Sequence, residues 1–393
     1  MTGFGHGMRE HWLLEPDTVY LNHGTVGAPP RRVLAAQQAI RDEIERQPAR
    51  FLLRELATLQ VGQGGAAPKR LRVAAAAVAA FLGAHGDDLV FVDNATAGIN
   101  AVLRSIALGA GDEIIVLDHA YGAVAKVASF VARERGAVVR TVELPWPPAP
   151  HAVVAAVTAA LGSRTRVAVV DHVTAESALV LPLAEIAAAC RARGVAVVAD
   201  GAHAPGAIPV DIPALGVDWY VGNLHKWAWT PRSCGILWAT PERQAGLHPP
   251  VVSWGLDQGF TCEFDWPGTR DPSAALAAPA ALAFMRELGV EAVQSYDHAL
   301  AWRAGEMLGA RWGVPIVQDE AQIGTMITVP LPERAGGSRE AAARLRDALL
   351  FDDHIEVQLH AFHGRLWVRV SAQIYNDETD VERLATAVAA RAF

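Results

Sequence analysis

Short apolar runs alternate with longer amphipathic stretches over residues 89–199, and these two periods are typical of strands and helices respectively. Strands are predicted at 89–92, 113–117, 138–143, 166–170 and 195–199, with two more at 217–221 and 234–238. Helices are predicted between them at 96–107, 121–135, 151–161 and 182–193. Such alternation produces a mainly parallel sheet with helices on both faces. We therefore expect an α/β fold whose large domain contains a seven-stranded sheet.

The pattern differs at both ends of the chain. A short strand at 19–24 precedes helices at 31–46 and 69–82, and the Gly-rich segment 63–68 reads as a loop, either near a site or merely on the surface. After residue 256 the order becomes helix, helix, strand, helix, strand, strand, helix, with predicted bounds 274–288, 291–311, 322–329, 338–350, 355–359, 366–370 and 377–390. We expect three parts: residues 1–19 joining a small domain, a large domain at 20–256, and the small α+β domain at 257–393.

Composition narrows the class of protein. The chain has 393 residues, 51% of them hydrophobic and 19% charged, and a formal net charge of −8. This balance argues against a nucleic-acid partner, and no apolar run approaches the roughly 18 residues of a membrane span. Three separated cysteines, Cys190, Cys234 and Cys262, form no CxxC pair. We expect no disulfide framework and no metal site, and a cytoplasmic location.

Two polar residues follow apolar runs at positions where a parallel sheet binds its ligands. Asp200 ends the run 195–199, and Lys226 follows the run 217–221. A lysine can form a Schiff base with pyridoxal 5′-phosphate (PLP), while an acid keeps the pyridine nitrogen protonated. The alternatives are a solvated surface lysine and an aspartate that caps a helix or forms an ion pair. Trp219, Trp227, Trp229 and Trp238 make an apolar setting, which would make Lys226 a better nucleophile.

Other strand ends carry further candidates. Thr96 opens a helix whose amides could bind a phosphate, although an ordinary helix cap explains the same residues. Tyr121 could stack on a flat ring or pass a proton, or simply pack on the sheet. Thr174 lies in the polar segment 171–177, where the sequence does not select the active atom. Arg369 alternates with apolar residues on a late strand, so it could bind a carboxylate with two hydrogen bonds or pair with a nearby acid.

Taken together, these segments resemble the class V aminotransferase superfamily of fold-type-I PLP enzymes. The matching pieces are Asn94-Ala95-Thr96, Asp200-Gly201-Ala202-His203, His225-Lys226, Gly268-Thr269-Arg270 and the segment 369–376. They extend over nearly the whole chain. Within the superfamily, the segments 20–24 and 225–227, the Tyr121 site and Ser-Ala-Gln-Ile-Tyr-Asn at 371–376 are similar to the isopenicillin N epimerase branch. That branch also contains carbon–sulfur lyases similar to those of ergothioneine biosynthesis.

The resemblance implies a role for each residue. Lys226 would bind PLP and move the Cα proton, Asp200 would face the pyridine nitrogen, and Tyr121 would stack on the ring or act on its opposite face. The other cofactor contacts implied are Ala95, Thr96, Thr174, His203 and His225, with Thr269 supplied by the neighbouring subunit of a homodimer that shares its active sites. The substrate, a small molecule of the amino-acid class, would be bound by Asn22, His23 and Arg369.

The reaction itself stays open at this level. An epimerase, a β-elimination lyase acting on a cysteine-derived substrate, and a transaminase all begin by removing the Cα proton. The branch resemblance favours the epimerase. The related cysteine desulfurases carry a nucleophilic cysteine before the late arginine strand, and residues 357–364 contain none, so we set desulfuration aside. A non-enzymatic binding module is disfavoured because Asp200 and Lys226 are both intact.

Overall fold

A seven-stranded sheet forms the centre of the computed structural model, which describes residues 3–59 and 67–392. The strands lie in the order β2-β8-β7-β6-β5-β3-β4, and β8 alone runs against its neighbours. Their bounds are β2 Leu89–Val92, β3 Glu113–Leu117, β4 Val138–Val142, β5 Thr165–Asp171, β6 Ala196–Gly201, β7 Trp219–Asn223 and β8 Gly235–Ala239. The mainly parallel seven-stranded sheet expected from the alternating pattern is therefore confirmed.

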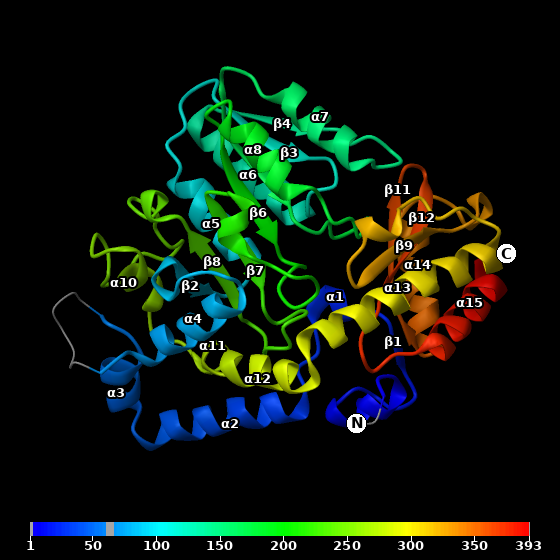
Figure 1. Ribbon diagram of the computed structural model, residues 1–393, viewed down its shortest axis with the longest axis horizontal. Helices are drawn as coiled ribbons and strands as arrows, with labels where there is room; N and C mark the ends of the chain where they lie inside the picture. Colours follow the sequence, from blue (N-terminus) through cyan, green and yellow to red (C-terminus); the bar gives the residue numbers. More distant parts are fainter. Residues whose placement is uncertain (1–2, 60–66, 393) are drawn as a thin grey trace.

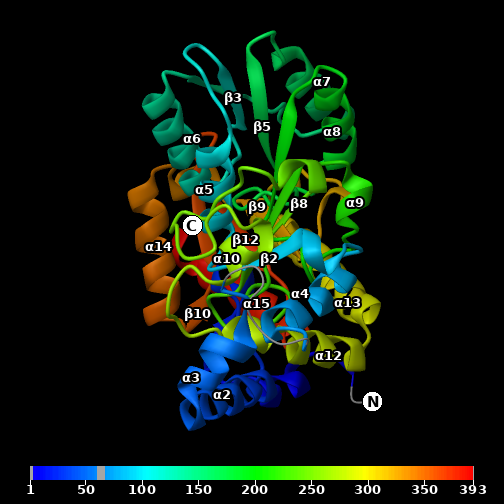
Figure 2. The same ribbon diagram turned by 90° about the vertical axis from the view of Figure 1, so that its left-hand side faces the viewer.

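Helices cover both faces of this sheet, because successive side chains of a strand point to opposite faces. In β6, Val198 packs into the core under α5 (Ala95–Ser105) and α6 (Gly122–Arg135), together with α10 (Phe260–Asp265). Ala199 packs into the opposite core. That core is closed by helices α4 Arg70–Phe81, α7 Pro150–Ala160, α8 Leu183–Arg191, α9 Ile212–Leu215, α11 Ser273–Leu276 and α12 Ala278–Leu288. Figure 2 shows α6 on one side of β3 and β5, and α7 and α8 on the other.

The small domain is built on a three-stranded antiparallel sheet in the order β11-β12-β9. These strands are β9 Met326–Pro330, β11 Gln358–Phe362 and β12 Arg365–Ser371. Three helices share their core: α13 Val290–Trp312, α14 Arg339–Phe351 and α15 Glu378–Ala392. The long helix α13 runs from α12, below the large sheet, to the small sheet (Figure 1).

The N-terminal segment connects the two parts. Strand β1 (Val19–Tyr20) pairs with β10 (Ile355–Glu356) of the small domain, and the Gly5 amide donates to the Ile374 carbonyl. The remaining N-terminal elements are a 3-10 turn at His6–His11, the short helix α1 His23–Val26, α2 Arg31–Arg46, α3 Pro48–Arg50 and a π-helical turn at Phe51–Leu56. The domain limits at 19 and 256 stay predictions. In the structure, α10 to α12 pack against the large-sheet layers.

Some predicted elements differ from those observed. The strand expected at 322–329 begins only at Met326, because the Asp319 side chain and Gln322 form a capping box around a 3-10 turn. The strand expected at 355–359 divides at Val357 into β10 and β11, which belong to different sheets. The strand expected at 19–24 ends at Tyr20. Most of the predicted Gly-rich loop, residues 63–66, lies outside the described residues.

Among the described residues no single helix is long and apolar enough to cross a membrane. Ser273–Leu288 and Val290–Trp312 meet that test only as a pair, with a bend of 76° between them. The expected compartment therefore stays a prediction.

Candidate active site

A cavity of about 370 Å³ opens at the edge where β2, β3, β5, β6 and β7 end. Parallel strands bring their carboxyl ends to one edge, and ligands of such sheets bind there. Seven of the residues expected in the site line this cavity: Ala95, Thr96, Tyr121, Asp200, His203, His225 and Lys226. The strand-end residues named from the sequence are therefore brought together, although up to 131 positions separate them in the chain.

Lys226 lies in a tight turn directly after β7. Its Nζ is 3.0 Å from Nε2 of His203, and its backbone carbonyl accepts a hydrogen bond of 3.0 Å from Nε2 of His23. Burial, together with the Arg369 charge, lowers the pKa of Lys226 to about 7, and Asp200 opposes this shift. At neutral pH this amine is therefore available both to accept and to donate a proton.

The backbone around Lys226 is supported from behind by the segment that follows Asn22. Gly27 has a φ of +66°, and a Cβ there would collide with the His225 carbonyl, so only glycine fits this close approach. His23 is fully buried, and its Nδ1 lies 2.8 Å from the Tyr375 hydroxyl. From the sequence, His23 was expected to bind the substrate. The structure instead places it beneath Lys226, where both ring nitrogens form hydrogen bonds that support the turn.

Two buried carboxyls face each other at the strand ends. Asp200 on β6 is 4% exposed, and its Oδ1 accepts the Ala202 amide at 3.0 Å. Asp171 on β5 pairs with it in register and is equally buried. Burial raises the pKa of Asp200, while the Ala202 amide and the Lys226 charge oppose that rise. Burial and the neighbouring Asp200 raise the pKa of Asp171 well above its ordinary value. Each carboxylate therefore makes ionisation of the other less favourable.

Sequence reasoning missed Asp171, which lines the cavity together with Thr25 and Asn223. It belongs to the polar segment 171–177, from which Thr174 was expected to contact the cofactor. The Thr174 hydroxyl instead lies 2.7 Å from the Ser177 hydroxyl and accepts the Leu179 amide at 2.8 Å. It stabilises its own loop and does not line the cavity. The place of Asp171 in the site depends on β5 and β6 being neighbours in the sheet.

The N-terminus of α5 forms the opposite wall. Asn94 caps the helix by accepting the Ala97 amide at 2.9 Å, and Asn223 accepts the Ala95 amide at 2.8 Å. The Ala95 amide, expected to bind a phosphate, is thus engaged within the chain. The Thr96 amide has no hydrogen-bond partner in the described parts of the chain. This helix start, with the partly buried His225 beside it, can bind an anion.

Arg369 lies just behind the cavity on β12 and is 3% exposed. Its guanidinium donates to the Ala175 carbonyl at 2.5 Å and to the Thr25 hydroxyl at 2.7 Å. Its Nε has no partner among the described residues. Asn22 accepts from the same guanidinium at 3.3 Å and donates to Glu356, so it orients Arg369. A buried cation with an unused donor suits a substrate carboxylate.

Thr269, another expected cofactor contact, also does not line the Lys226 cavity. It lines a separate cavity of about 270 Å³ with Val251, while its neighbour Arg270 pairs with Asp93 at 3.0 Å. Tyr121, by contrast, reaches the rim of the Lys226 cavity with 51% of its surface exposed. Within one chain, therefore, Thr269 does not contribute to the Lys226 cavity.

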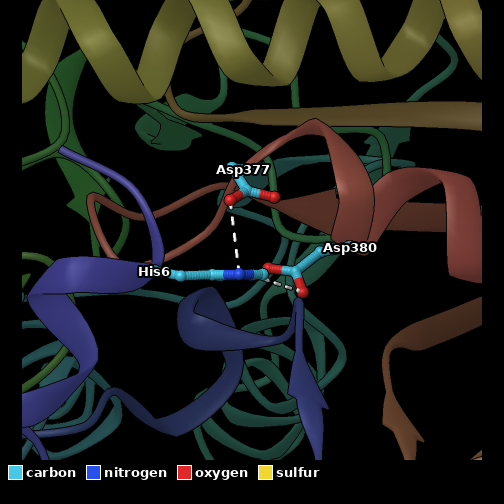
Figure 3. Close-up of side chains that lie close together, drawn as sticks. All are labelled: His6, Asp377 and Asp380. Atoms are coloured by element: carbon cyan, nitrogen blue, oxygen red, sulfur yellow. Dashed lines mark hydrogen bonds and ion pairs between the residues drawn. The ribbon is translucent and has the colours of Figure 1, made fainter.

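A second group of titratable side chains, none of which lines this cavity, is formed by His6, Asp377 and Asp380 (Figure 3). The ring of His6 stands between Asp377 and Asp380, with nitrogen–oxygen distances of 3.3 and 3.0 Å. These atoms lie within 4.8 Å of one another, as a metal site would require. However, both ring nitrogens already face carboxylates, and Asn376 donates to Asp380 at 2.8 Å. These polar contacts join the N-terminal segment to the start of α15.

The sequence and structure were compared with known proteins. The family model described as Aminotransferase class-V matches residues 60–384. Isopenicillin N epimerase of Streptomyces clavuligerus is 32% identical over 97% of this chain and 96% of that protein. A probable chloroplastic L-cysteine desulfhydrase of Arabidopsis thaliana is 33% identical over 95% of this chain and 83% of that protein.

The fold is also that of solved structures with lower sequence identity. A mutant of the protein C-DES, solved with glycine covalently linked to its PLP cofactor, is 21% identical with a TM-score of 0.79, covering 97% of this chain and 98% of its own. A cysteine desulfurase from Escherichia coli is 20% identical with a TM-score of 0.77, covering 98% and 97%. The family model covers most of the chain, and two relatives above 30% identity align over nearly all of it. The chain belongs to the class-V aminotransferase family.

Proposed function

We propose that this chain is a PLP-dependent enzyme that removes and returns the Cα proton of an amino acid, as an epimerase does. One observation carries the proposal: Lys226 is a desolvated amine with a pKa of about 7 in a cavity that it shares with Asp200. A base works best when its pKa is near the working pH. An amine of this kind can take a proton from Cα and give one back without a change of pH.

The residues around the cavity fit PLP. Its volume of about 370 Å³ is within the range of small-molecule sites. Asp200 would face the pyridine nitrogen, and a pyridinium there would offset the cost of the buried carboxylate. Thr96, at the start of α5, and His225 would hold the phosphate, and Tyr121 at the rim would cover the ring. When bound, PLP supplies a sink for the electron pair left at Cα.

The chain's own groups then divide the remaining work. Arg369, which contacts the cavity residues Thr25 and Ala175, would bind the α-carboxylate and so place Cα beside Lys226. Nζ of Lys226 would accept the proton from Cα and hold it until it is returned. Tyr121 would present its hydroxyl at the cavity rim, where it could return a proton from another direction. Asn22 and His23 would act indirectly, since Asn22 orients Arg369 and His23 supports the Lys226 turn.

A second candidate is β-elimination from a cysteine-derived substrate. The relatives named L-cysteine desulfhydrase favour it, at 33% and 34% identity over 95% of this chain. Proton removal from Cα is common to both reactions, and only a leaving group at Cβ distinguishes them. Transfer of sulfur to the enzyme is disfavoured, because the β11–β12 hairpin contains no cysteine and Cys190, Cys234 and Cys262 are buried.

We infer that the active unit is a homodimer. Thr269 and Arg270 lie outside the cavity of their own chain, and the neighbouring segment exposes Val251, Val252 and Trp254 by 56 to 69%. A second copy would cover this apolar segment, and Thr269 would reach the phosphate-binding end of that copy's cavity. Light scattering should give twice the 41.8 kDa of one chain, and Trp254→Asp should shift the mass toward one.

The reaction is tested by incubating the PLP-loaded enzyme with a panel of L-amino acids and cysteine conjugates in deuterated water. Epimerisation predicts Cα deuterium in both enantiomers and no keto acid. Pyruvate with a released sulfur compound would support β-elimination instead. A requirement for an added keto acid would identify a transaminase and contradict the proposal.

A further inference from the structure

We propose that Trp227 is a positioning residue that fixes the tautomer of His203 and thereby keeps the Lys226 side chain beside it as a free amine. The part that this plays in turnover rests on the function proposed above. The tautomer and the state of Lys226 are properties of the protein alone. Trp227 is an apolar neighbour of Lys226, and its indole N–H also donates a hydrogen bond to His203.

The three side chains form a relay that begins at the indole. Nε1 of Trp227 donates to Nδ1 of His203 at 3.4 Å, and Nε2 of His203 lies 3.0 Å from Nζ of Lys226. An indole nitrogen can only donate, so Nδ1 of His203 must accept. A neutral imidazole carries one proton, which then has to be on Nε2. The nitrogen that faces Lys226 is therefore an N–H group.

The imidazole is neutral because charging it in this place is unfavourable. His203 is 3% exposed, and burial lowers its pKa well below the ordinary value. The positive charges of Lys226 and Arg369 lower it further, as do the neighbouring imidazoles of His360 and His225. With Nε2 as donor, Nζ of Lys226 has to accept. An amine has a lone pair for this purpose and an ammonium has none, so the contact favours neutral Lys226.

The indole is held firmly enough for this role. Trp227 is 1% exposed and packs with Met326 and with the ring of His23, whose centroid is 5.1 Å away. Its carbonyl side is closed by Gly206, where φ is +92° and a Cβ would collide with the Trp227 backbone. The side chain therefore has little freedom to withdraw its N–H from His203.

Other buried tryptophans show that such a hydrogen bond is not general in this protein. Trp229, two residues further along, is completely buried, and its Nε1 has no partner in the described residues. The same holds for Nε1 of Trp219 and Trp238. Trp229→Phe is thus a matched control for Trp227→Phe, since each removes an N–H from a buried ring beside the same turn.

Loss of the indole N–H would release the imidazole proton to either nitrogen. With the proton on Nδ1, Nε2 would become an acceptor and would stabilise a protonated Lys226. The midpoint of Lys226 ionisation should then rise by about 0.5 to 1 pH unit, the equivalent of one ordinary hydrogen bond. Asp200, which also favours the charged amine, would act in the same direction and in both proteins.

The test uses the full-length chain without cofactor. Nitrogen-15 spectra of the native protein, with His203 assigned by comparison with His203→Gln, should show the Nε2–H tautomer. Acetic anhydride labelling against pH, read by mass spectrometry, should show a Lys226 midpoint that is higher in Trp227→Phe and unchanged in Trp229→Phe. Exposed Lys126 serves as the reference amine in every sample.

Two results would overturn the proposal. One is an Nδ1–H tautomer at His203 in the native protein, a measurement that needs no variant and stands even if Trp227→Phe does not fold. The other is a Lys226 midpoint in Trp227→Phe equal to that of Trp229→Phe. Neither readout uses turnover, so failure to find epimerase activity would leave this inference standing, and its own failure would leave the reaction untouched.

Discussion

The Lys226 cavity and the His6 cluster both bring titratable side chains together, yet their surroundings are opposite. Around Lys226, the partners Asp200 and His203 are 4% and 3% exposed, and nearby Arg369 Nε has no partner in the described chain. In the His6 cluster, the His6 and Asp377 side chains are 45% and 34% exposed. There both ring nitrogens meet carboxylates (Figure 3). Asn376 also donates a hydrogen bond to the buried Asp380.

The comparison shows what proximity alone does not supply. Charged groups that satisfy one another at a surface stabilise a fold modestly, because water screens them. Charged groups that are desolvated next to an open cavity change their pKa values and retain unused donors, and such groups bind and transform ligands. Substitutions at the cavity should therefore have much larger effects than substitutions at the His6 cluster.

The largest effect is expected for Lys226→Ala. Under the proposed function, loss of the amine would remove both the covalent attachment of PLP and the group that moves the Cα proton, so kcat should fall by roughly 10⁴-fold or more. Deuterium exchange at Cα, followed by NMR, measures this directly. Lys126→Ala is the matched control, because Lys126 is exposed on α6 and should be replaceable without loss. Turnover by Lys226→Ala at the native rate would remove the basis of the proposed reaction.

Arg369→Lys should have the next largest effect. Lysine keeps the charge but loses the planar fork that donates to Ala175 and Thr25 and that would bind the substrate carboxylate. We expect kcat/KM to fall by ~30- to 1000-fold, about 2–4 kcal/mol, mainly through KM. Arg365→Lys on the same strand is the control, since Arg365 donates to the Leu331 carbonyl away from the cavity. Equal losses in the two variants would show that Arg369 serves the hairpin and not the substrate.

The pH dependence of proton exchange should report the lowered pKa of Lys226. The amine must be unprotonated to take a proton, and burial sets its pKa at about 7. Exchange from bound substrate in single-turnover experiments should therefore fall about tenfold per pH unit below 7 and level off above it. Because Asp200 raises this pKa, Asp200→Asn should move the limb to lower pH. A limb near the ordinary lysine pKa of 10.5 would contradict the burial argument.

The sequence pattern predicted the residues that line the cavity better than the residues that support them. Parallel strands share one edge for their carboxyl ends, so a residue after each strand was enough to bring Lys226, Asp200 and Tyr121 together. Asp171 was not selected, because its importance depends on β5 and β6 being neighbours in register. Thr174 turns into its own loop, and His23 lies under Lys226. The directions in which these side chains point are determined by tertiary packing, which hydrophobic periodicity and residue spacing do not encode.

The smallest effect is expected at the His6 cluster. His6→Ala removes two contacts that join the N-terminal turn to α15, one of them to the buried Asp380. Asp380 retains its hydrogen bond from Asn376, so no carboxylate is left without a partner. The free energy of unfolding in urea should therefore fall by only about 0.5–1 kcal/mol, with unchanged kcat and KM. His85→Ala is the control, because His85 is 76% exposed and lies 3.8 Å from Asp87 in a weaker surface pair. If this cluster only joins the N-terminal turn to α15, EDTA should not change the stability of the native protein. A loss of stability in EDTA that is absent in His6→Ala would instead identify the cluster as a metal site.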